Sequence, residues 1–276
     1  MRLLNGKELA GFIQERQAKE VRRLRQAMGV QPRLAIVLTV DNPVIDVYVR
    51  LKKRYGEDIL VDVDIHRVDQ SEVRDLLDKL SDDDSVHAII VQLPLADPAE
   101  TTEVLNLVDP DKDVDGLVPG SKFEPATALA IMWLLAGYNI QMLGKEVVLI
   151  GHGKLVGQPL EKLLQADGIT PTIVDVNTPN PKEIVSSADV VITATGVPGL
   201  VTADMIKEKA VVVDAGVASE GGKKVGDVAK EVYEERDDLT ITPRKGGVGP
   251  LTVCALFENV IRAAQRVSEQ SKQSVQ

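Results

Sequence analysis

The 276-residue sequence has few aromatic residues, one cysteine and three histidines. Because aromatic residues make up only 3% of the chain, its core must be aliphatic, which suits buried parallel strands. The single cysteine, Cys254, excludes an internal disulfide bond and a cysteine-based zinc site. The histidines His66, His87 and His152 are scattered without metal-ligand spacing, so we expect no metal site.

Long apolar runs are also absent. No run reaches the roughly 18 residues needed to span a bilayer, and the start, MRLLNGKELA, lacks the apolar core of a signal peptide. Acidic residues outnumber basic ones by 42 to 32, a formal net charge of −10, which argues against nucleic acid and anionic membranes as partners. We therefore expect a cytoplasmic protein that binds neither nucleic acid nor membrane.

Strand-like and helix-like segments alternate in the first part of the chain. The apolar runs 33–40 and 87–95 and the alternating segment 60–68 are typical of strands. Helical spacing is found at 7–28, 44–56, 71–84 and 99–107. This βαβαβ order predicts a parallel sheet with helical crossovers.

A second alternating series follows residues 108–127, which are dense in Asp, Pro and Gly and indicate a domain boundary. Strands are expected at 146–151, 170–176, 189–196, 210–217 and 240–243, and helices at 128–140, 157–166, 181–187, 201–206 and 250–270. The pattern predicts an α/β protein of two domains. Residues 1–120 are expected to form an N-terminal α/β domain, and residues 121–250 a Rossmann-like, doubly wound dinucleotide-binding domain.

The sequence GHGKLVGQP, at 151–159, stands between a predicted strand and a predicted helix. Glycines in this context let the backbone approach a pyrophosphate at a helix N-terminus, although such a loop can also be only a structural turn. The candidate cofactor contacts in the loop are Gly151, His152, Gly153, Lys154, Val156 and Gly157. Asp175, 18 residues past Gly157, ends the next strand and would favour NAD by accepting ribose hydroxyls. Lys154 and His152 could instead meet a phosphate, so the choice between NAD and NADP stays open.

Tyr48 and Lys52 are four residues apart and share one face of a predicted helix. A partly buried lysine can have a lowered pKa and act as a base or proton relay. The same spacing arises by chance in many helices. It also occurs in short-chain dehydrogenases, but in those enzymes the glycine loop precedes the Tyr-Lys pair. Here the order is reversed, so we reject that class.

Three further motifs are candidates for ligand contact, and the first of them lies at a strand end, where open α/β sheets bind ligands. Gln92 ends a predicted strand and could both donate to and accept from a lysine amine. The carboxylates of DPDKDVDG, at 109–116, could bind a metal ion or simply face solvent. Alternatively, one of them could accept hydrogen bonds from the N–H groups of a heterocycle. In KGGVGPLTV, at 245–253, three glycines in four positions favour ligand contact over a simple turn.

Taken in order, these motifs resemble the bifunctional methylenetetrahydrofolate dehydrogenase/cyclohydrolase family over nearly the whole chain. The resemblance is carried by NP and YVRLKK within 42–53, IIVQLPL (89–95), DPDKDVDGL (109–117), IGHGKLVGQP (150–159), ATGVPGLV (194–201) and GGVGPLTV (246–253). It implies oxidation of 5,10-methylenetetrahydrofolate with NADP or NAD, then hydrolysis of the methenyl product to 10-formyltetrahydrofolate. It also implies that residues 1–120 are the folate-binding substrate domain, completed by the C-terminal helix 251–270, which returns to pack on it. A homodimer joined through the cofactor domains is implied as well.

The resemblance implies a role for each candidate residue. Lys52 would be the catalytic lysine, oriented by Gln92, and Tyr48 would stack on the folate. Asp115 would hydrogen-bond the pterin ring. The folate cleft would be lined by Gly246, Gly247, Val248 and Pro250, and Thr195, Gly196 and Asp175 would join the 151–157 loop around the cofactor.

The sequence departs from the family pattern at two places. The link 117–127 is short, and Pro125–Ala130 replaces a Pro-Cys-Thr-Pro-x-Gly stretch. Arg244 and Lys245 add two positive charges before Gly246, which could attract a folate glutamate tail or a cofactor phosphate, or face solvent. The short link leaves two alternatives to a bifunctional enzyme: a relative with only one of the two activities, or a non-enzymatic dinucleotide-binding protein.

Overall fold

The computed structural model describes residues 1–220 and 223–273, which fold into two compact units. One unit comprises Met1–Gly11 and Thr127–Thr252, and we call it the six-stranded unit after its main sheet. The other comprises Phe12–Ala126 and the chain from Val253 onward, and we call it the three-stranded unit. Both are α/β structures with parallel main sheets, which confirms the predicted fold class.

The three-stranded unit is built on a parallel sheet of order β3-β2-β4. Its strands are β2 (Arg33–Leu38), β3 (Asp62–Arg67) and β4 (Ala88–Val91), and its crossover helices are α2 (Pro43–Ile59), α3 (Val73–Asp82) and α4 (Thr101–Leu105). The central strand β2 and β4 are apolar and buried because helices cover them, whereas the edge strand β3 is only half-buried. Short 3₁₀ turns, Gln70–Glu72 and Pro98–Glu100, precede α3 and α4.

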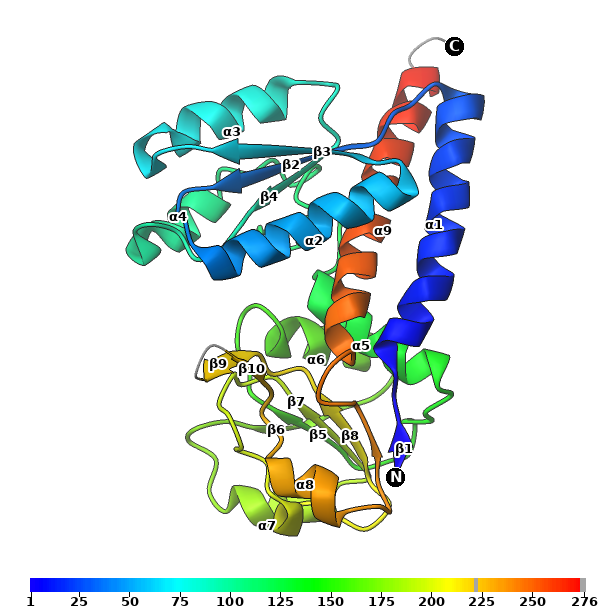
Figure 1. Ribbon diagram of the computed structural model, residues 1–276, viewed down its shortest axis with the longest axis vertical. Coiled ribbons are helices and arrows are strands. Elements are labelled where there is room, and N and C mark those ends of the chain that lie inside the picture. Colours follow the sequence, from blue (N-terminus) through cyan, green and yellow to red (C-terminus); the bar gives the residue numbers. More distant parts are fainter. Residues whose placement is uncertain (221–222, 274–276) are drawn as a thin grey trace. The chain divides into compact units, whose positions relative to one another are not determined.

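Most of two long helices also belongs to this unit: α1 (Gly6–Met28) from Phe12 onward, and the C-terminal helix α9 (Val248–Gln273) from Val253 onward. They run side by side in Figure 1, and Gln17 of α1 donates through Nε2 to the backbone oxygen of Cys254 in α9 at 2.9 Å. Phe257 of α9 is fully buried, with its ring 5.0 Å from that of Tyr55 in α2. The prediction that the final helix returns to the first domain is confirmed.

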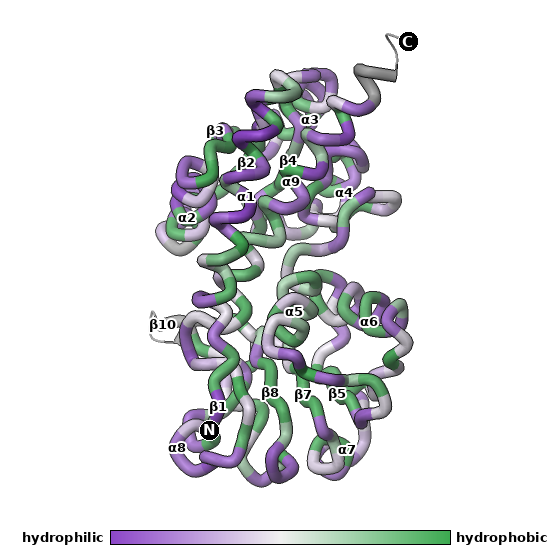
Figure 2. The backbone as a smooth tube through the Cα atoms, turned by 90° about the vertical axis from the view of Figure 1, so that its right-hand side faces the viewer, coloured by the Kyte–Doolittle hydropathy of each residue, from purple (hydrophilic) through white to green (hydrophobic). Residues whose placement is uncertain are grey.

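The six-stranded unit has the strand order β1-β11-β8-β7-β5-β6, with all pairs parallel. Its strands are β1 (Arg2–Leu3), β5 (Val147–Ile150), β6 (Thr172–Val174), β7 (Val190–Thr193), β8 (Val211–Asp214) and β11 (Thr240–Ile241). The helices are α5 (Ala126–Gly137), α6 (Gly157–Ala166), α7 (Pro181–Ser187) and α8 (Lys230–Glu235), with a 3₁₀ turn at Ala203–Met205. Figure 2 shows β5, β7 and β8 as apolar segments, as expected for central strands.

The order of the strands creates a ligand-binding position in this sheet. The chain runs from β5 outward to β6 and then crosses back to β7 on the other side of β5. In open α/β sheets the crevice at such a switch point, beyond the carboxyl ends of the strands, is where ligands bind. The loops after β5 and β7 therefore occupy the expected cofactor position.

The structure also contains elements without a counterpart in the sequence-based prediction. These are strand β1, helix α8 and an antiparallel hairpin of β9 (Ala218–Glu220) and β10 (Lys223–Val225). Residues 1–11 belong to the six-stranded unit rather than to a domain of residues 1–120, because β1 extends the sheet beside β11. None of the described helices is long and apolar enough to cross a membrane.

Candidate active site

Lys52 lies in the three-stranded unit, on helix α2, one turn after Tyr48. Its Nζ donates to Oε1 of Gln92 at 2.9 Å, and both side chains are partly buried. Gln92 directly follows β4, and its amide group donates to the backbone oxygen of Leu93 at 3.0 Å. This second hydrogen bond fixes which end of the Gln92 amide faces the lysine.

Asp115 is the third member of this group. Burial lowers the pKa of Lys52, while the negative charge of Asp115 opposes that shift. Burial likewise raises the pKa of Asp115, and the charge of Lys52 opposes it. The structure thus brings together Lys52, Gln92 and Asp115, three residues far apart in the sequence.

The carboxylates around Asp115 have separate roles in the fold. Asp109 accepts the backbone N–H of Asp111 at 2.9 Å and so closes a local turn. Asp113 is buried and accepts the N–H of Val118 at 2.8 Å, and burial raises its pKa. Within the part of the chain that the structure describes, no three His, Cys, Asp or Glu side chains are grouped to hold a metal ion.

The short link after Asp115 packs tightly against the loop that carries this residue. Ser121 Oγ donates to the backbone oxygen of Asp113 at 2.9 Å, and Phe123 is buried. Gly116 has φ +70°, and a Cβ there would collide with the backbone of residues 123–125. The link therefore supports the position of Asp115 by direct backbone packing.

The glycine loop of the six-stranded unit forms a tight strand-to-helix turn. Gly151 has φ +96°, and a Cβ on Gly157 would collide with the backbone oxygen of Gly151. Gly153, in contrast, has open space where a Cβ would lie. The first and last glycines thus close the turn, and the middle one leaves the backbone accessible at the N-terminus of α6, as a pyrophosphate would require.

Two charged residues flank this loop. Asp175 is exposed and accepts from the N–H of Asn177 at 2.9 Å and from Thr178 Oγ1 at 3.0 Å. These hydrogen bonds lower the pKa of Asp175. His152 lies 2.7 Å from Glu161 Oε2 through its Nε2 and is therefore already engaged by a carboxylate.

Exposed apolar side chains surround the carboxyl edge of the six-stranded sheet. Strands β5, β6, β7 and β8 are each followed within five residues by one such side chain: Leu155, Val176, Val197 and Val217. Val176 is 99% exposed. These side chains follow the strand ends at the edge where open α/β sheets bind ligands, next to the glycine loop.

The glycines around the start of α9 differ in their surroundings. Gly246 has φ +83°, and its backbone oxygen accepts the N–H of Lys7 at 2.9 Å. Gly247 faces Gly6 so closely that a Cβ on Gly6 would collide with its backbone oxygen. The left-handed backbone explains Gly246, and the close approach of the Gly247 oxygen explains Gly6. A Cβ on Gly247 itself would lie 3.0 Å from Thr242 Cβ, whereas Gly249 is exposed with open space where a Cβ would lie.

The two added cations differ in their surroundings. Arg244 is exposed and places its guanidinium 5.9 Å from the ring centre of Tyr233. Lys245 is exposed. One buried polar group near the glycine loop had no signal in the sequence: the carboxylate of Asp227, which accepts hydrogen bonds from Thr193 at the end of β7 and from Thr195 in the loop that follows.

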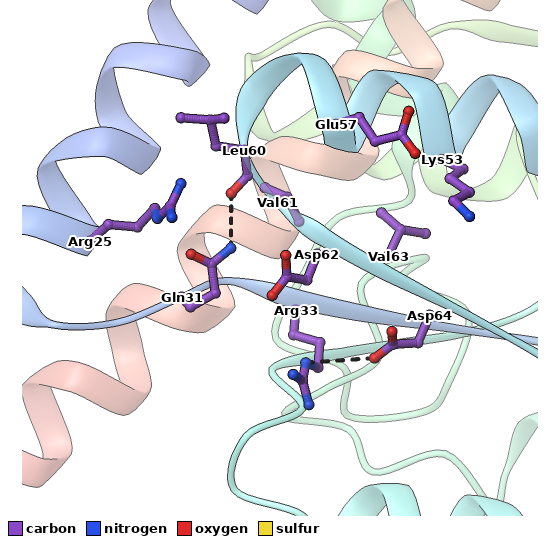
Figure 3. Close-up of a pocket in the computed structure, with 10 residues that line it drawn as sticks. All are labelled: Arg25, Gln31, Arg33, Lys53, Glu57, Leu60, Val61, Asp62, Val63 and Asp64. Carbon is purple, nitrogen blue, oxygen red and sulfur yellow. Dashed lines mark hydrogen bonds and ion pairs between the residues drawn. The ribbon is translucent and has the colours of Figure 1, made fainter.

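The pocket in Figure 3 lies elsewhere in the three-stranded unit, beside the start of β3, with a volume of about 400 Å³. Its charged lining consists of Arg25, Arg33, Lys53, Glu57, Asp62 and Asp64. Cations and carboxylates are equal in number here, and Arg33 is paired with Asp64 at 3.5 Å. Lys53 points into this pocket, so the neighbouring lysines of α2 belong to different surfaces.

Comparisons with known proteins agree with this geometry. The model of the tetrahydrofolate dehydrogenase/cyclohydrolase catalytic domain matches residues 4–115, and that of the NAD(P)-binding domain of the same enzymes matches residues 125–268. Bifunctional protein FolD of Lactobacillus acidophilus is 38% identical over 278 residues, covering 96% of this chain and 98% of its own.

Solved structures show the same likeness. The bifunctional FolD enzyme of Campylobacter jejuni is 35% identical with a TM-score of 0.91, covering 96% of this chain and 99% of its own. The Trypanosoma brucei methylenetetrahydrofolate dehydrogenase-cyclohydrolase, solved with NADP and an inhibitor, is 31% identical with a TM-score of 0.88, covering 96% and 97%.

Proposed function

Because the chain belongs to the tetrahydrofolate dehydrogenase/cyclohydrolase family, we propose that Lys52 serves both reactions of a bifunctional enzyme of one-carbon metabolism. The enzyme oxidises 5,10-methylenetetrahydrofolate to the methenyl cation with NAD or NADP and then hydrolyses the cation to 10-formyltetrahydrofolate. The observation that carries the role of Lys52 is its 2.9 Å hydrogen bond to Gln92, in a buried setting that also contains Asp115.

The dehydrogenase step depends on holding two molecules in place. When bound, NAD or NADP accepts the hydride that leaves the methylene carbon of the folate. We assign the cofactor pyrophosphate to the 151–157 loop, where the backbone is open at Gly153. Asp115 accepts hydrogen bonds from the pterin ring, and the Tyr48 ring packs on the folate.

Hydrolysis uses the lysine as a proton carrier. The oxygen of water bonds to the methenyl carbon, and one proton of the water passes to Lys52 Nζ and on to solution. The second proton moves to N5 of the pterin as the bond between this nitrogen and the carbon breaks, which leaves the formyl group on N10. Burial favours the neutral amine that can accept a proton, and the Gln92 oxygen keeps that amine oriented.

The reaction is tested by supplying the purified chain with methylenetetrahydrofolate and either NAD or NADP, and following the reduced nicotinamide. Hydrolysis is tested separately with methenyltetrahydrofolate. Both activities are expected. Hydrolysis without oxidation, or the reverse, would indicate a monofunctional relative, and dinucleotide binding without either activity would indicate a non-enzymatic protein.

NAD is the proposed cofactor. The Asp175 carboxylate stands at the end of the second strand of the dinucleotide fold, where it would accept ribose hydroxyls and repel a 2′-phosphate. His152, which could otherwise meet that phosphate, faces Glu161. The test is the ratio of kcat/KM for NAD to that for NADP, and a ratio below one would reject this proposal.

We further propose that the protein is a cytoplasmic homodimer joined through its cofactor domains, without nucleic-acid or membrane partners. The resemblance supports the dimer. The net charge of −10 argues against binding to nucleic acid or to anionic membranes. Light scattering of the purified chain tests the dimer: a monomeric mass would contradict it.

A further inference from the structure

Asp227 is a fully buried carboxylate between β10 and α8 in the six-stranded unit. Its Oδ2 accepts two hydrogen bonds, from Thr193 Oγ1 at 2.6 Å and from the backbone N–H of Thr195 at 2.7 Å. Thr193 is the last residue of β7, and Thr195 belongs to the loop that follows this strand. The carboxylate thus holds the chain where β7 reaches the proposed cofactor position.

Thr195 in turn lies against the glycine loop. A Cβ added to Gly151 would come within 2.9 Å of Thr195 Cγ2 and 2.8 Å of the Ala194 oxygen. The N–H of Ala194 also donates to the oxygen of Ile150, at the end of β5, at 2.9 Å. Any movement of Thr195 would therefore change the space available to Gly151, where the dinucleotide loop begins.

A second carboxylate fixes the backbone that carries Asp227. Asp214, the last residue of β8, accepts the N–H groups of Gly216, Asp227 and Val228, each at 3.0 Å. The glycines 216 and 226 are required for this arrangement. A Cβ on Gly216 would collide with the Asp227 carboxylate, and one on Gly226 would collide with the Asp214 carboxylate.

The two carboxylates are costly to bury. Burial raises the pKa of Asp214, and the neighbouring charge of Asp227 raises it further. Oδ1 of Asp227 has no hydrogen-bond partner among the described residues. An apolar side chain of the same size would avoid this cost of desolvation and repulsion, so space-filling alone does not explain Asp227.

We propose that Asp227 is a positioning residue for dinucleotide binding. It holds Thr193 and Thr195 so that the loops after β5 and β7 keep the shape that receives the cofactor. Asp227 acts through these threonines, because its own side chain is fully buried. The inference rests on the proposed function in one respect, that this unit binds NAD.

The test compares two substitutions of similar size at one position. Asp227→Asn keeps a carbonyl oxygen that can accept from Thr193 and Thr195, so the dissociation constant for NAD should stay within about threefold of that of the unaltered protein. Asp227→Leu has no acceptor, and the constant should rise by roughly tenfold, equivalent to ~1.4 kcal/mol. Hydrolysis of methenyltetrahydrofolate without NAD, which depends on Lys52, should persist in both variants and report that the chain is folded.

The outcomes separate this inference from the proposed function. If the unaltered protein binds no dinucleotide, the proposed function fails. If it binds NAD and Asp227→Leu binds NAD equally well, Asp227 has no positioning role. Equal losses in the Asn and Leu variants would also overturn the proposal, because the acceptor geometry would then be irrelevant.

A second pair of variants covers the case in which Asp227→Leu does not fold. Thr193→Val keeps the shape of the side chain but removes the hydroxyl donor, and Thr193→Ser keeps the donor. The valine variant should raise the dissociation constant several-fold, on the order of one lost charge-assisted hydrogen bond, and the serine variant should restore it. Unchanged binding by a folded valine variant would contradict the proposal. Asp204→Asn, an exposed carboxylate of the same unit, is the matched control and should leave binding unchanged.

Discussion

The amine of Lys52 and the amide oxygen of Gln92 are 2.9 Å apart, although 40 residues separate them in the chain. Helix α2 supplies the lysine, and the carboxyl end of β4 supplies the glutamine. Asp115 adds a negative charge that raises the pKa of the lysine against the effect of burial. These three residues give the proposed chemistry its geometry and its pH dependence.

Replacement of Lys52 by methionine should abolish hydrolysis of methenyltetrahydrofolate. The substitution keeps most of the side-chain stem and removes the amine, so folding should be retained while the proton carrier is lost. We expect a decrease of at least about 100-fold, the usual contribution of a general base, measured as the initial rate of methenyl disappearance.

Lys53→Met is the matched control for this experiment. Lys53 is the next residue of the same helix, is exposed, and points into the separate pocket of Figure 3. Its substitution should leave hydrolysis unchanged. Hydrolysis that survives in Lys52→Met would show that another group carries the proton.

Replacement of Asp115 by asparagine should move the pH profile of kcat for hydrolysis. The negative charge of Asp115 stabilises the ammonium form of Lys52 and so raises its pKa. Without that charge the pKa falls further, so the neutral amine persists to lower pH and the acidic limb of the profile shifts to lower pH. KM for the folate should rise at the same time, because Asp115 is the proposed pterin contact.

The control for this shift is Asp111→Asn, an exposed carboxylate of the same loop. It should leave both the profile and KM unchanged. A shift of the acidic limb to higher pH in Asp115→Asn would contradict the assigned sign of the interaction.

Gly157→Ala should weaken dinucleotide binding. A Cβ at this position would collide with the backbone oxygen of Gly151, so the turn between β5 and α6 must open. We expect the dissociation constant for NAD to rise by at least tenfold, ~1.4 kcal/mol or more, in a fluorescence or calorimetric titration. Gly11→Ala, at a helical position with open space around it, should bind normally.

Asp175→Ser should shift cofactor choice toward NADP. The hydrogen bonds from Asn177 and Thr178 lower the pKa of Asp175, so its carboxylate is ionised at neutral pH and repels a 2′-phosphate. Serine removes that charge and can donate to a phosphate. The ratio of kcat/KM for NADP to that for NAD should rise by roughly tenfold, the effect of about 1.4 kcal/mol, and an unchanged ratio would exclude Asp175 from cofactor selection.

Asn259→Leu should destabilise the three-stranded unit. The buried amide of Asn259 donates to the backbone oxygens of Val114 and Glu124, both at 2.9 Å, and so ties helix α9 to the loop around Asp115. Leucine would leave both oxygens unpaired in the interior, at a cost of about 1–3 kcal/mol each. The free energy of unfolding in urea should fall accordingly, whereas the exposed neighbour Arg262→Leu should have little effect.

Much of the fold could be predicted from local patterns. Runs such as residues 33–38 and 88–91 are apolar because both faces of a parallel strand are buried, and that property is visible in the sequence. The hairpin β9–β10 and the two-residue strand β1 had no such signal. Two residues, Arg2–Leu3, are too few to show the alternation of a strand. They form one only because they pair with the edge of β11.

The sequence by itself determined the alternation of strands and helices, the glycine loop beyond β5 and the helical spacing of Tyr48 and Lys52, because each depends on neighbours along the chain. The tertiary structure decided what surrounds Lys52. Burial and the charge of Asp115 set its pKa, and Gln92 accepts a hydrogen bond from its amine. Asp115 and Gln92 lie 63 and 40 residues away along the chain, so only packing brings them to Lys52. For the same reason Asp227 could not be found in advance: its role depends on hydrogen bonds to the end of β7, 34 residues earlier in the chain.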